Sequence, residues 1–281
     1  MPELPEVETV CEGLRRSVLD EKIQTVTLNR PDLRIPFPKN MRERLKGHKV
    51  KSISRRAKYI IAHFGNSLVL AIHLGMSGRL MILGAAEEYK KQTHDHMVIK
   101  MESGKAVVFN DPRRFGMVYL LHEDDLDTHK AFKHLGPEPL GNDFSAPVLK
   151  EKLKNKKSAI KTAIMDQRVV VGVGNIYACE ALYRSGIHPN RPANTIKGKR
   201  ADKLVQEIRN VLGEAIAAGG SSLKDYRHTD GELGYFQHRF SVYGREKEKC
   251  PACDCDNKKT EGVRRIVQSG RSTFYCPVKQ T

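Results

Sequence analysis

Residues 135–140 divide this sequence into two parts with different apolar patterns. The segment reads Leu-Gly-Pro-Glu-Pro-Leu, and its prolines and glycine interrupt helices and strands alike, as in a linker. Before it, only residues 6–18 have helical spacing, and Val- and Ile-rich runs lie at 50–64, 68–74, 97–101 and 106–109. The last two flank Glu-Ser-Gly-Lys, which predicts a β-hairpin. We therefore expect a β-sandwich or flattened barrel with one N-terminal helix.

Beyond the linker the pattern becomes helical. Apolar residues recur at helical spacing in the runs 146–154, 159–166, 176–186 and 200–218. Gly219 and Gly220 end the last run, as glycines commonly do at helix ends. An irregular stretch and a cysteine-containing segment follow. The sequence thus predicts an α+β chain of a β-sandwich domain, a helical domain and a C-terminal hairpin, over residues 1–134, 135–245 and 246–281.

The charge balance points to a polyanionic partner. The chain carries 49 Lys and Arg residues against 33 Asp and Glu, a formal net charge of +16. Nucleic acid is the commonest partner of so basic a domain, although a generally solvated basic surface has the same composition. The basic residues recur along the whole chain and do not collect in a tail, which favours a folded binding face.

Nothing in the sequence indicates a membrane or an export signal. No run approaches the roughly 20 apolar residues that a membrane span needs. The first eight residues are acidic and contain two prolines, unlike the basic and then apolar regions of a signal peptide. We expect a soluble protein of the cytoplasm.

Four of the six cysteines fall within the last 32 residues, which favours a metal site over a disulfide framework. Cys250, Cys253 and Cys276 resemble three corners of a zinc ribbon, whose second pair requires a cysteine at position 279. That residue is Lys279, and a protonated lysine has no lone pair to offer. Cys255, water or another side chain remain open as the fourth ligand, as does a hairpin that folds without metal.

The N-terminus contains a potential nucleophile. Removal of Met1 leaves Pro2 with a secondary amine, whose pKa of roughly 8 makes a useful fraction unprotonated near neutral pH. Such an amine can attack a sugar carbon and form a Schiff base, with Glu3 assisting proton transfer. From these residues alone, a stiffened chain end and acidic residues at a helix N-terminus are the simpler interpretation.

Resemblance changes that interpretation. The start of the chain, residues 1–9, resembles that of the formamidopyrimidine-DNA glycosylases. Later segments match the same family in the same order, at 55–59, 72–78, 111–116, 172–178 and 270–276. Together they span almost the whole chain.

The resemblance implies a bifunctional DNA glycosylase and abasic-site lyase that removes oxidised purines from duplex DNA. Pro2 is then the Schiff-base nucleophile and Glu3 the acid and base that helps to open the sugar. Lys58 serves β-elimination and contacts phosphate, and Arg271 grips the lesion phosphate and serves δ-elimination. An arginine suits this last task because its planar fork can hold a phosphate with two bonds.

It also implies DNA contacts. Extruding a base leaves a gap, which Met76, Arg113 and Phe115 would fill, with Arg113 reading the opposite cytosine. The other implied DNA- or substrate-binding residues are Glu6, His73, His94, Lys156, Asn175 and Tyr243. Asn175 would lie in a helix–two-turn–helix domain, and residues 219–234 would cover the extruded base. Singly, each of these is as well explained as a core or surface residue.

Two alternatives stay open. A glycosylase similar to endonuclease VIII would act on oxidised pyrimidines. A DNA-lesion-binding protein without catalysis is suggested by Lys279, because a loose hairpin would misplace Arg271. Either way we expect damaged double-stranded DNA as the partner, a monomer, zinc as the one cofactor in question and no redox cofactor.

Overall fold

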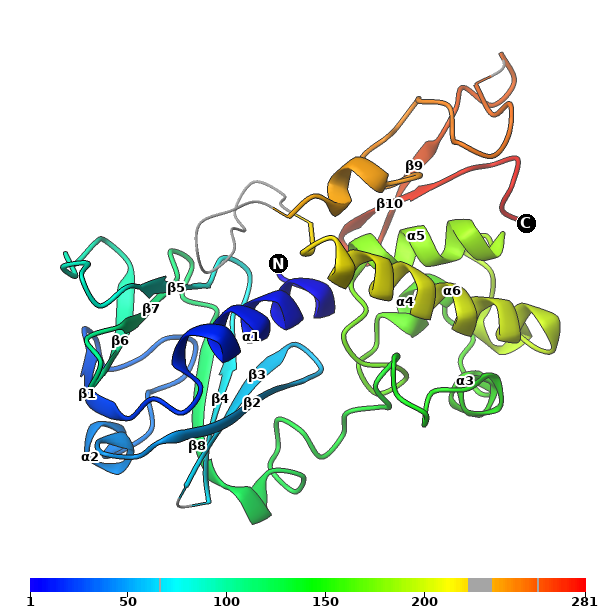
Figure 1. Cartoon of the computed structure of the whole chain (residues 1–281). Helices are drawn as coiled ribbons and strands as arrows, with labels where there is room; N and C mark the ends of the chain where they lie inside the picture. Colours follow the sequence, from blue (N-terminus) through cyan, green and yellow to red (C-terminus); the bar gives the residue numbers. More distant parts are fainter. Residues whose placement is uncertain (66, 222–233, 257) are drawn as a thin grey trace. The chain divides into compact units, whose positions relative to one another are not determined.

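The computed structural model describes residues 1–65, 67–221, 234–256 and 258–281 (Figure 1). The chain forms two compact units. The first comprises Met1–Lys133 with Ala218–Tyr235, and the second comprises His134–Ala217 with Phe236–Thr281. Among the described residues, no helix is both long and apolar enough to cross a membrane.

The first unit contains a β-sandwich, as expected. One sheet has the strand order β1 (Ile23–Leu28), β6 (Asp95–Met101), β7 (Ala106–Asn110) and β5 (Arg79–Leu83). The other has the order β2 (Val50–Arg56), β3 (Tyr59–Phe64), β4 (Leu68–His73) and β8 (Met117–His122). All neighbouring strands in both sheets run antiparallel. The predicted hairpin over 97–109 is confirmed as β6 and β7.

Helix α1 (Leu4–Val18) completes the core of this unit. Its apolar face joins one buried cluster with residues of both sheets, such as Ile60 and Phe109. The helix begins after Glu3 with a capping box, in which the Glu3 side chain accepts from the backbone of Glu6 and the Glu6 side chain accepts from that of Glu3. The start of the chain is thereby fixed against the sandwich.

The run 50–64 comprises two strands, because Ala57, with a φ of 53°, and Lys58 form a tight turn between β2 and β3. The number of helices in the first unit differs from the sequence prediction. A second helix, α2 (Met41–Leu45), and a 3-10 turn, η1 (Glu123–Asp125), lie where no helix was expected. The prediction of a single helix in this part was therefore wrong.

The second unit is helical with a C-terminal hairpin, as predicted. Its helices are α3 (Ala146–Leu153), α4 (Ile160–Ile164), α5 (Asn175–Ser185) and α6 (Lys199–Ala217), with short 3-10 turns η2 (Ala193–Thr195) and η3 (Phe236–Arg239). Strands β9 (Arg264–Gln268) and β10 (Arg271–Tyr275) pair as the hairpin. Helix α5 ends at Gly186, whose φ of 70° is left-handed.

Buried polar residues organise this unit. The carboxylate of Glu180, on α5, is fully buried and accepts hydrogen bonds of 2.9 Å from the backbone N–H groups of Ser241, Val242 and Tyr243. Cys179 and Tyr183 of the same helix pack in one cluster with the cysteines of the C-terminal segment. Helix α5 therefore anchors both segments that follow α6.

Candidate functional site

Pro2 and Glu3 are buried at the start of α1, and Met1 before them is 51% exposed. Glu3 is 3% exposed and Glu6 is 2% exposed. The second carboxylate oxygen of Glu6 accepts from the backbone N–H and the hydroxyl of Ser221, at 2.8 and 2.9 Å. Glu6 thus ties the N-terminus to the chain just after α6. The cover predicted over 219–234 lies largely outside the described residues.

Lys58 and His73 lie at the ends of adjacent strands. Lys58 occupies the β2–β3 turn and is only 7% exposed, and His73 ends β4. Burial, then the positive charge of Lys58, lowers the pKa of His73 to about 4. The backbone N–H of Gly75 donates to Nδ1 of His73 at 3.0 Å, which leaves Nε2 to carry the proton. His73 is therefore a neutral hydrogen-bond donor beside a buried cation.

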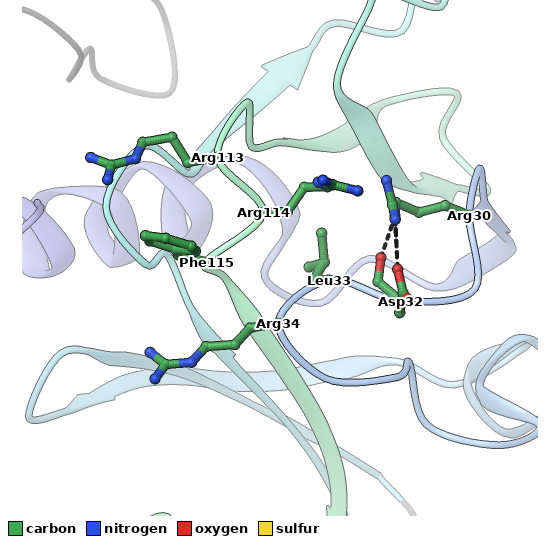
Figure 2. A pocket seen from close by; sticks show the side chains of 7 residues that line it. All are labelled: Arg30, Asp32, Leu33, Arg34, Arg113, Arg114 and Phe115. Atoms are coloured by element: carbon green, nitrogen blue, oxygen red, sulfur yellow. Dashed lines mark hydrogen bonds and ion pairs between the residues drawn. The ribbon is translucent and has the colours of Figure 1, made fainter.

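Met76, Arg113 and Phe115 project from two loops that the fold holds together. Met76 is 37% exposed and Phe115 is 41% exposed, so both present apolar surface to solvent. The guanidinium of Arg113 lies 5.0 Å from the centre of the Phe115 ring (Figure 2). At Gly75, a Cβ atom would come within 2.4 Å of the Phe115 backbone, so only glycine permits this approach.

Ser77 and Asp111 join these loops, and sequence reasoning did not single them out. The Ser77 hydroxyl donates to the buried Asp111 carboxylate at 2.6 Å, and the backbone N–H of Arg113 donates to the same hydroxyl at 3.0 Å. The other oxygen of Asp111 accepts from the backbone N–H of Gly116 at 2.8 Å. His94 is exposed nearby, and its carbonyl accepts from the Asp111 backbone at 3.0 Å.

In the second unit, Asn175 is the first residue of α5 and contacts the hairpin. Its amide donates to the Ser272 carbonyl at 2.9 Å and accepts from Nζ of Lys161 at 2.5 Å. Lys161 is 1% exposed and also donates to the Thr273 hydroxyl at 2.6 Å. This buried lysine was missed in the sequence, where it appears as one basic residue among many.

Arg271, Lys156 and Tyr243 surround this network. Arg271 is exposed at the start of β10 and lines a cavity of about 140 Å³ with Lys161, Asp166 and others. Lys156 pairs with Asp166 at 3.2 Å, and the pKa of that carboxyl is lowered chiefly by its bond to Arg168. The ring of Tyr243 packs edge-on against Phe274, with centroids 5.2 Å apart.

The cysteine segment brings four thiols together. The sulfur atoms of Cys250, Cys253, Cys255 and Cys276 all lie within 4.8 Å of one another. Three of them are 3.2 to 3.6 Å apart, and Cys255 accepts the backbone N–H of Cys250 at 3.0 Å. The Nζ of Lys279 lies 4.2 Å from the centre of the Tyr183 ring. The group has the composition and spacing of a structural metal site.

The first unit exposes apolar side chains beside an arginine, and in the second unit the start of α5 holds an arginine-bearing hairpin. Family comparison identifies the class of protein to which these features belong. Residues 1–118 match the formamidopyrimidine-DNA glycosylase N-terminal domain, and residues 135–227 match the H2TH domain of the same glycosylases. The chain belongs to the formamidopyrimidine-DNA glycosylase family, whose members act in DNA repair.

Related proteins match this chain over its full length. The formamidopyrimidine-DNA glycosylases of Rhodospirillum rubrum and Rhodospirillum centenum are 51% and 52% identical, each covering 100% of both chains. A mutant of the Lactococcus lactis Fpg, solved with a DNA containing Fapy-dG, is 33% identical with a TM-score of 0.89 and 100% coverage of both chains. The MutM (Fpg) protein of Thermus thermophilus is 37% identical with a TM-score of 0.87, covering 99% of this chain and 98% of that one.

Proposed function

We propose that this chain removes oxidised purines, including 8-oxoguanine and formamidopyrimidines, from duplex DNA and then cleaves the abasic site. The observation that carries the proposal is the buried Pro2–Glu3 pair, held by the capping box at the start of α1. A nucleophile needs a fixed position beside an acid, whereas the end of a chain is normally mobile. The solved relative from Lactococcus lactis with Fapy-dG DNA supports a purine lesion as substrate.

The reaction begins at Pro2, once Met1 has been removed. Its amine nitrogen bonds to C1′ of the extruded nucleotide, the C1′–N9 bond breaks, and the departing base takes up a proton. Glu3 protonates the ring oxygen O4′ while the nitrogen loses its own proton, so that the sugar opens to an iminium. Loss of the 2′ proton expels the 3′ phosphate, a second elimination expels the 5′ phosphate, and hydrolysis of the iminium frees Pro2.

The remaining residues bind and position the DNA. Lys58 supplies a buried positive charge for phosphate and for β-elimination. Arg271, which is exposed, supplies a positive charge for the lesion phosphate and for δ-elimination. Phosphate and substrate contacts are assigned to Glu6, His73, His94, Lys156, Asn175 and Tyr243. Because His73 is neutral, its contact is a hydrogen bond from Nε2 and not an ion pair.

Met76, Arg113 and Phe115 would enter the gap that the extruded base leaves. The flat Phe115 ring can stack on a base, and the donor fork of Arg113 complements the acceptors of cytosine. This arrangement favours 8-oxoguanine opposite cytosine over the same lesion opposite adenine.

The four thiols would hold a structural zinc ion. A tetrahedral zinc site, with Zn–S distances of about 2.3 Å, places its sulfurs about 3.8 Å apart. The sulfurs of Cys250, Cys253 and Cys276 lie 3.2 to 3.6 Å apart, slightly less than that spacing, and Cys255 is the remaining donor. Lys279 lies against Tyr183, so this chain would take its fourth ligand from Cys255. When bound, zinc would stabilise the segment that carries Arg271.

We also propose a role for each domain of the chain. Residues 1–134 would act as the catalytic domain, 135–245 as the DNA-binding domain and 246–281 as the zinc-binding hairpin. We further propose that the protein acts as a monomer in the cytoplasm.

Borohydride trapping on a duplex with one 8-oxoguanine opposite cytosine tests the function. The protein with Met1 removed should form a stable adduct, and Pro2→Gly should not. A 5-hydroxyuracil duplex tests the oxidised-pyrimidine alternative, which the oxidised-pyrimidine complex of the Lactococcus lactis protein keeps relevant. Binding without an adduct on either duplex would refute the proposed enzymatic activity and support a lesion-binding protein without catalysis.

A further inference from the structure

The hydroxyl of Tyr183 lies buried beside the group of four thiols. Tyr183 belongs to α5, is 2% exposed and packs in one cluster with Cys250, Cys255 and Cys276. Its oxygen is closed off from solvent, and within the part of the chain that the structure describes no oxygen or nitrogen atom accepts a hydrogen bond from it. A buried hydroxyl without an acceptor destabilises the folded protein, so this one calls for a partner.

A thiolate is the acceptor that the surroundings of this hydroxyl offer. Of the four thiols, that of Cys250 interacts most strongly with Tyr183, and after burial this interaction is the main cause that raises the pKa of the tyrosine. Cysteines bind zinc as thiolates, and four of them around one Zn²⁺ leave a net charge of about −2, which is costly to bury without donors. A charged acceptor also forms a stronger hydrogen bond than a neutral thiol. The hydroxyl is therefore suited to the metal-bound form of the segment.

Two backbone donors already contact sulfur atoms of this group. The N–H of Cys250 donates to Sγ of Cys255 at 3.0 Å, and the N–H of Lys279 donates to Sγ of Cys276 at 3.4 Å. Hydrogen bonds of this kind orient metal ligands and spread the charge of a coordinated thiolate. Tyr183 would add a side-chain donor to the set, directed at Cys250.

Lys279 contacts the ring of the same tyrosine. Its Nζ lies 4.2 Å from the ring centre, within the range of a cation–π interaction. The chain around it is fixed, because the Gln280 side chain accepts from the N–H of Cys276 at 2.7 Å and donates to the Ile187 carbonyl at 2.9 Å. The end of the chain thus lies against the end of α5 (Figure 1). The lysine at the position of the expected fourth cysteine therefore brings a positive charge to the site.

We propose that the Tyr183 hydroxyl donates a hydrogen bond to the zinc-bound thiolate of Cys250, and that Lys279 holds the ring in place for this bond. Both are positioning residues, because they act on the metal through its sulfur ligands. The inference rests on the proposed zinc site and goes beyond it, since it gives the residue that replaces the fourth cysteine a role of its own.

The zinc affinity of the full-length protein gives the first test. Tyr183→Phe removes only the hydroxyl, and its Kd for zinc, measured by competition with a chromophoric chelator, should rise about 10- to 100-fold. Tyr119→Phe removes a hydroxyl of the first unit and should keep the wild-type Kd. An unchanged Kd in Tyr183→Phe overturns the proposal. Wild-type protein that binds no zinc overturns the zinc site as well, so the two failures are distinguishable.

Cobalt in place of zinc separates a hydrogen bond from a packing contact. A donor bound to a thiolate lowers the energy of the sulfur lone pairs. Its loss in Tyr183→Phe should therefore shift the sulfur-to-cobalt charge-transfer bands to longer wavelength. A raised Kd with unchanged bands would make Tyr183 a packing residue only and would also overturn the proposal.

Lys279→Met tests the second residue, since it removes the charge and keeps most of the stem. The Kd for zinc should rise about two- to fivefold, whereas Lys258→Met, at an exposed lysine of the same segment, should leave it unchanged. In the Tyr183→Phe background K279M should cost less, because no hydroxyl remains to be held. Equal losses in the two backgrounds, or from the two lysines, overturn the role of Lys279. Borohydride trapping by wild type tests the glycosylase assignment independently of these measurements.

Discussion

The hydroxyl of Ser77 donates a 2.6 Å hydrogen bond to the buried carboxylate of Asp111, across 34 residues of sequence. The bond links the loop after β4 to the loop before β8. Since Met76 adjoins one partner and Arg113 and Phe115 follow the other, a single carboxylate sets the relative positions of all three exposed side chains. The arrangement of the side chains that would fill the gap in DNA is thus set by a buried hydrogen bond.

Asp111→Asn should loosen these loops. The amide cannot accept on both sides, so either Ser77 or the Gly116 N–H loses its partner. We expect a loss of about 1–3 kcal/mol in the free energy of unfolding. We also expect weaker discrimination between cytosine and adenine opposite the lesion. Urea unfolding and binding to the two duplexes measure these effects. Asp124→Asn, at an 88% exposed side chain, is the control, and equal behaviour of both variants would contradict the role of Asp111.

Lys161→Met should weaken DNA binding although Lys161 is buried. The substitution keeps most of the volume but removes the donors to Asn175 and Thr273, so the helix start and the hairpin lose the charged group that bridges them and keep only the bond from Asn175 to Ser272. Bonds to a charged group contribute about 1.5–3 kcal/mol, which predicts a roughly tenfold to hundredfold rise in Kd if Asn175 and Arg271 bind phosphate. Lys157→Met, at an exposed neighbour, removes the same formal charge. A rise in Kd of equal size in the two variants would show that only net charge matters.

His73 should make stability depend on pH. Its pKa is about 4 in the folded protein, because of burial and then the Lys58 charge, against about 6.5 when unfolded. Between these values the unfolded chain binds a proton that the folded protein does not. Stability is therefore complete above pH 6.5 and is lost as pH falls toward 4, by about 2 kcal/mol at pH 5. Urea unfolding at pH 7 and pH 5 measures the loss, and His73→Gln should remove this part of it. An identical loss in the variant would mean that His73 titrates normally.

Cys255→Ser should reduce the metal content. Wild-type protein should contain one zinc ion per chain by elemental analysis, and its cobalt-substituted form should show the absorption of tetrahedral thiolate coordination. The variant should bind substoichiometric metal with an altered cobalt spectrum, since one of four thiolates is lost. Cys11→Ser alters a buried thiol of the first unit and should retain full occupancy. Full zinc occupancy in Cys255→Ser would show that the fourth ligand is water or another side chain and not Cys255.

Periodicity predicted most of the fold, because strand and helix patterns are local. The helices over 146–218 were placed within about two residues. Helix α2 was missed because five residues, three of them charged, give no helical period. Strand β1 was missed because its polar residues dilute the apolar pattern.

The candidate site was predicted less completely. Motifs indicated Pro2, Arg113 and Arg271, but the positioning residues have no local signal. The burial of Lys161 depends on a contact with Thr273, 112 residues away. The Ser77–Asp111 bond likewise depends on how two loops meet in space. Burial and long-range pairing are properties of the folded chain, and local patterns in a single sequence do not predict them.

The carboxylate of Glu180 occupies a site of the type that binds phosphate in other proteins. Three successive backbone N–H groups converge on its carboxylate, in the manner of an anion-binding nest. Mutational tolerance on the two sides of this contact is therefore unequal. The donors at 241–243 come from the backbone and survive most side-chain replacements, whereas an apolar residue at position 180 leaves all three N–H groups without their acceptor. The backbone position of Tyr243, whose hydroxyl lies beside Asn175, thus depends on a single carboxylate of α5.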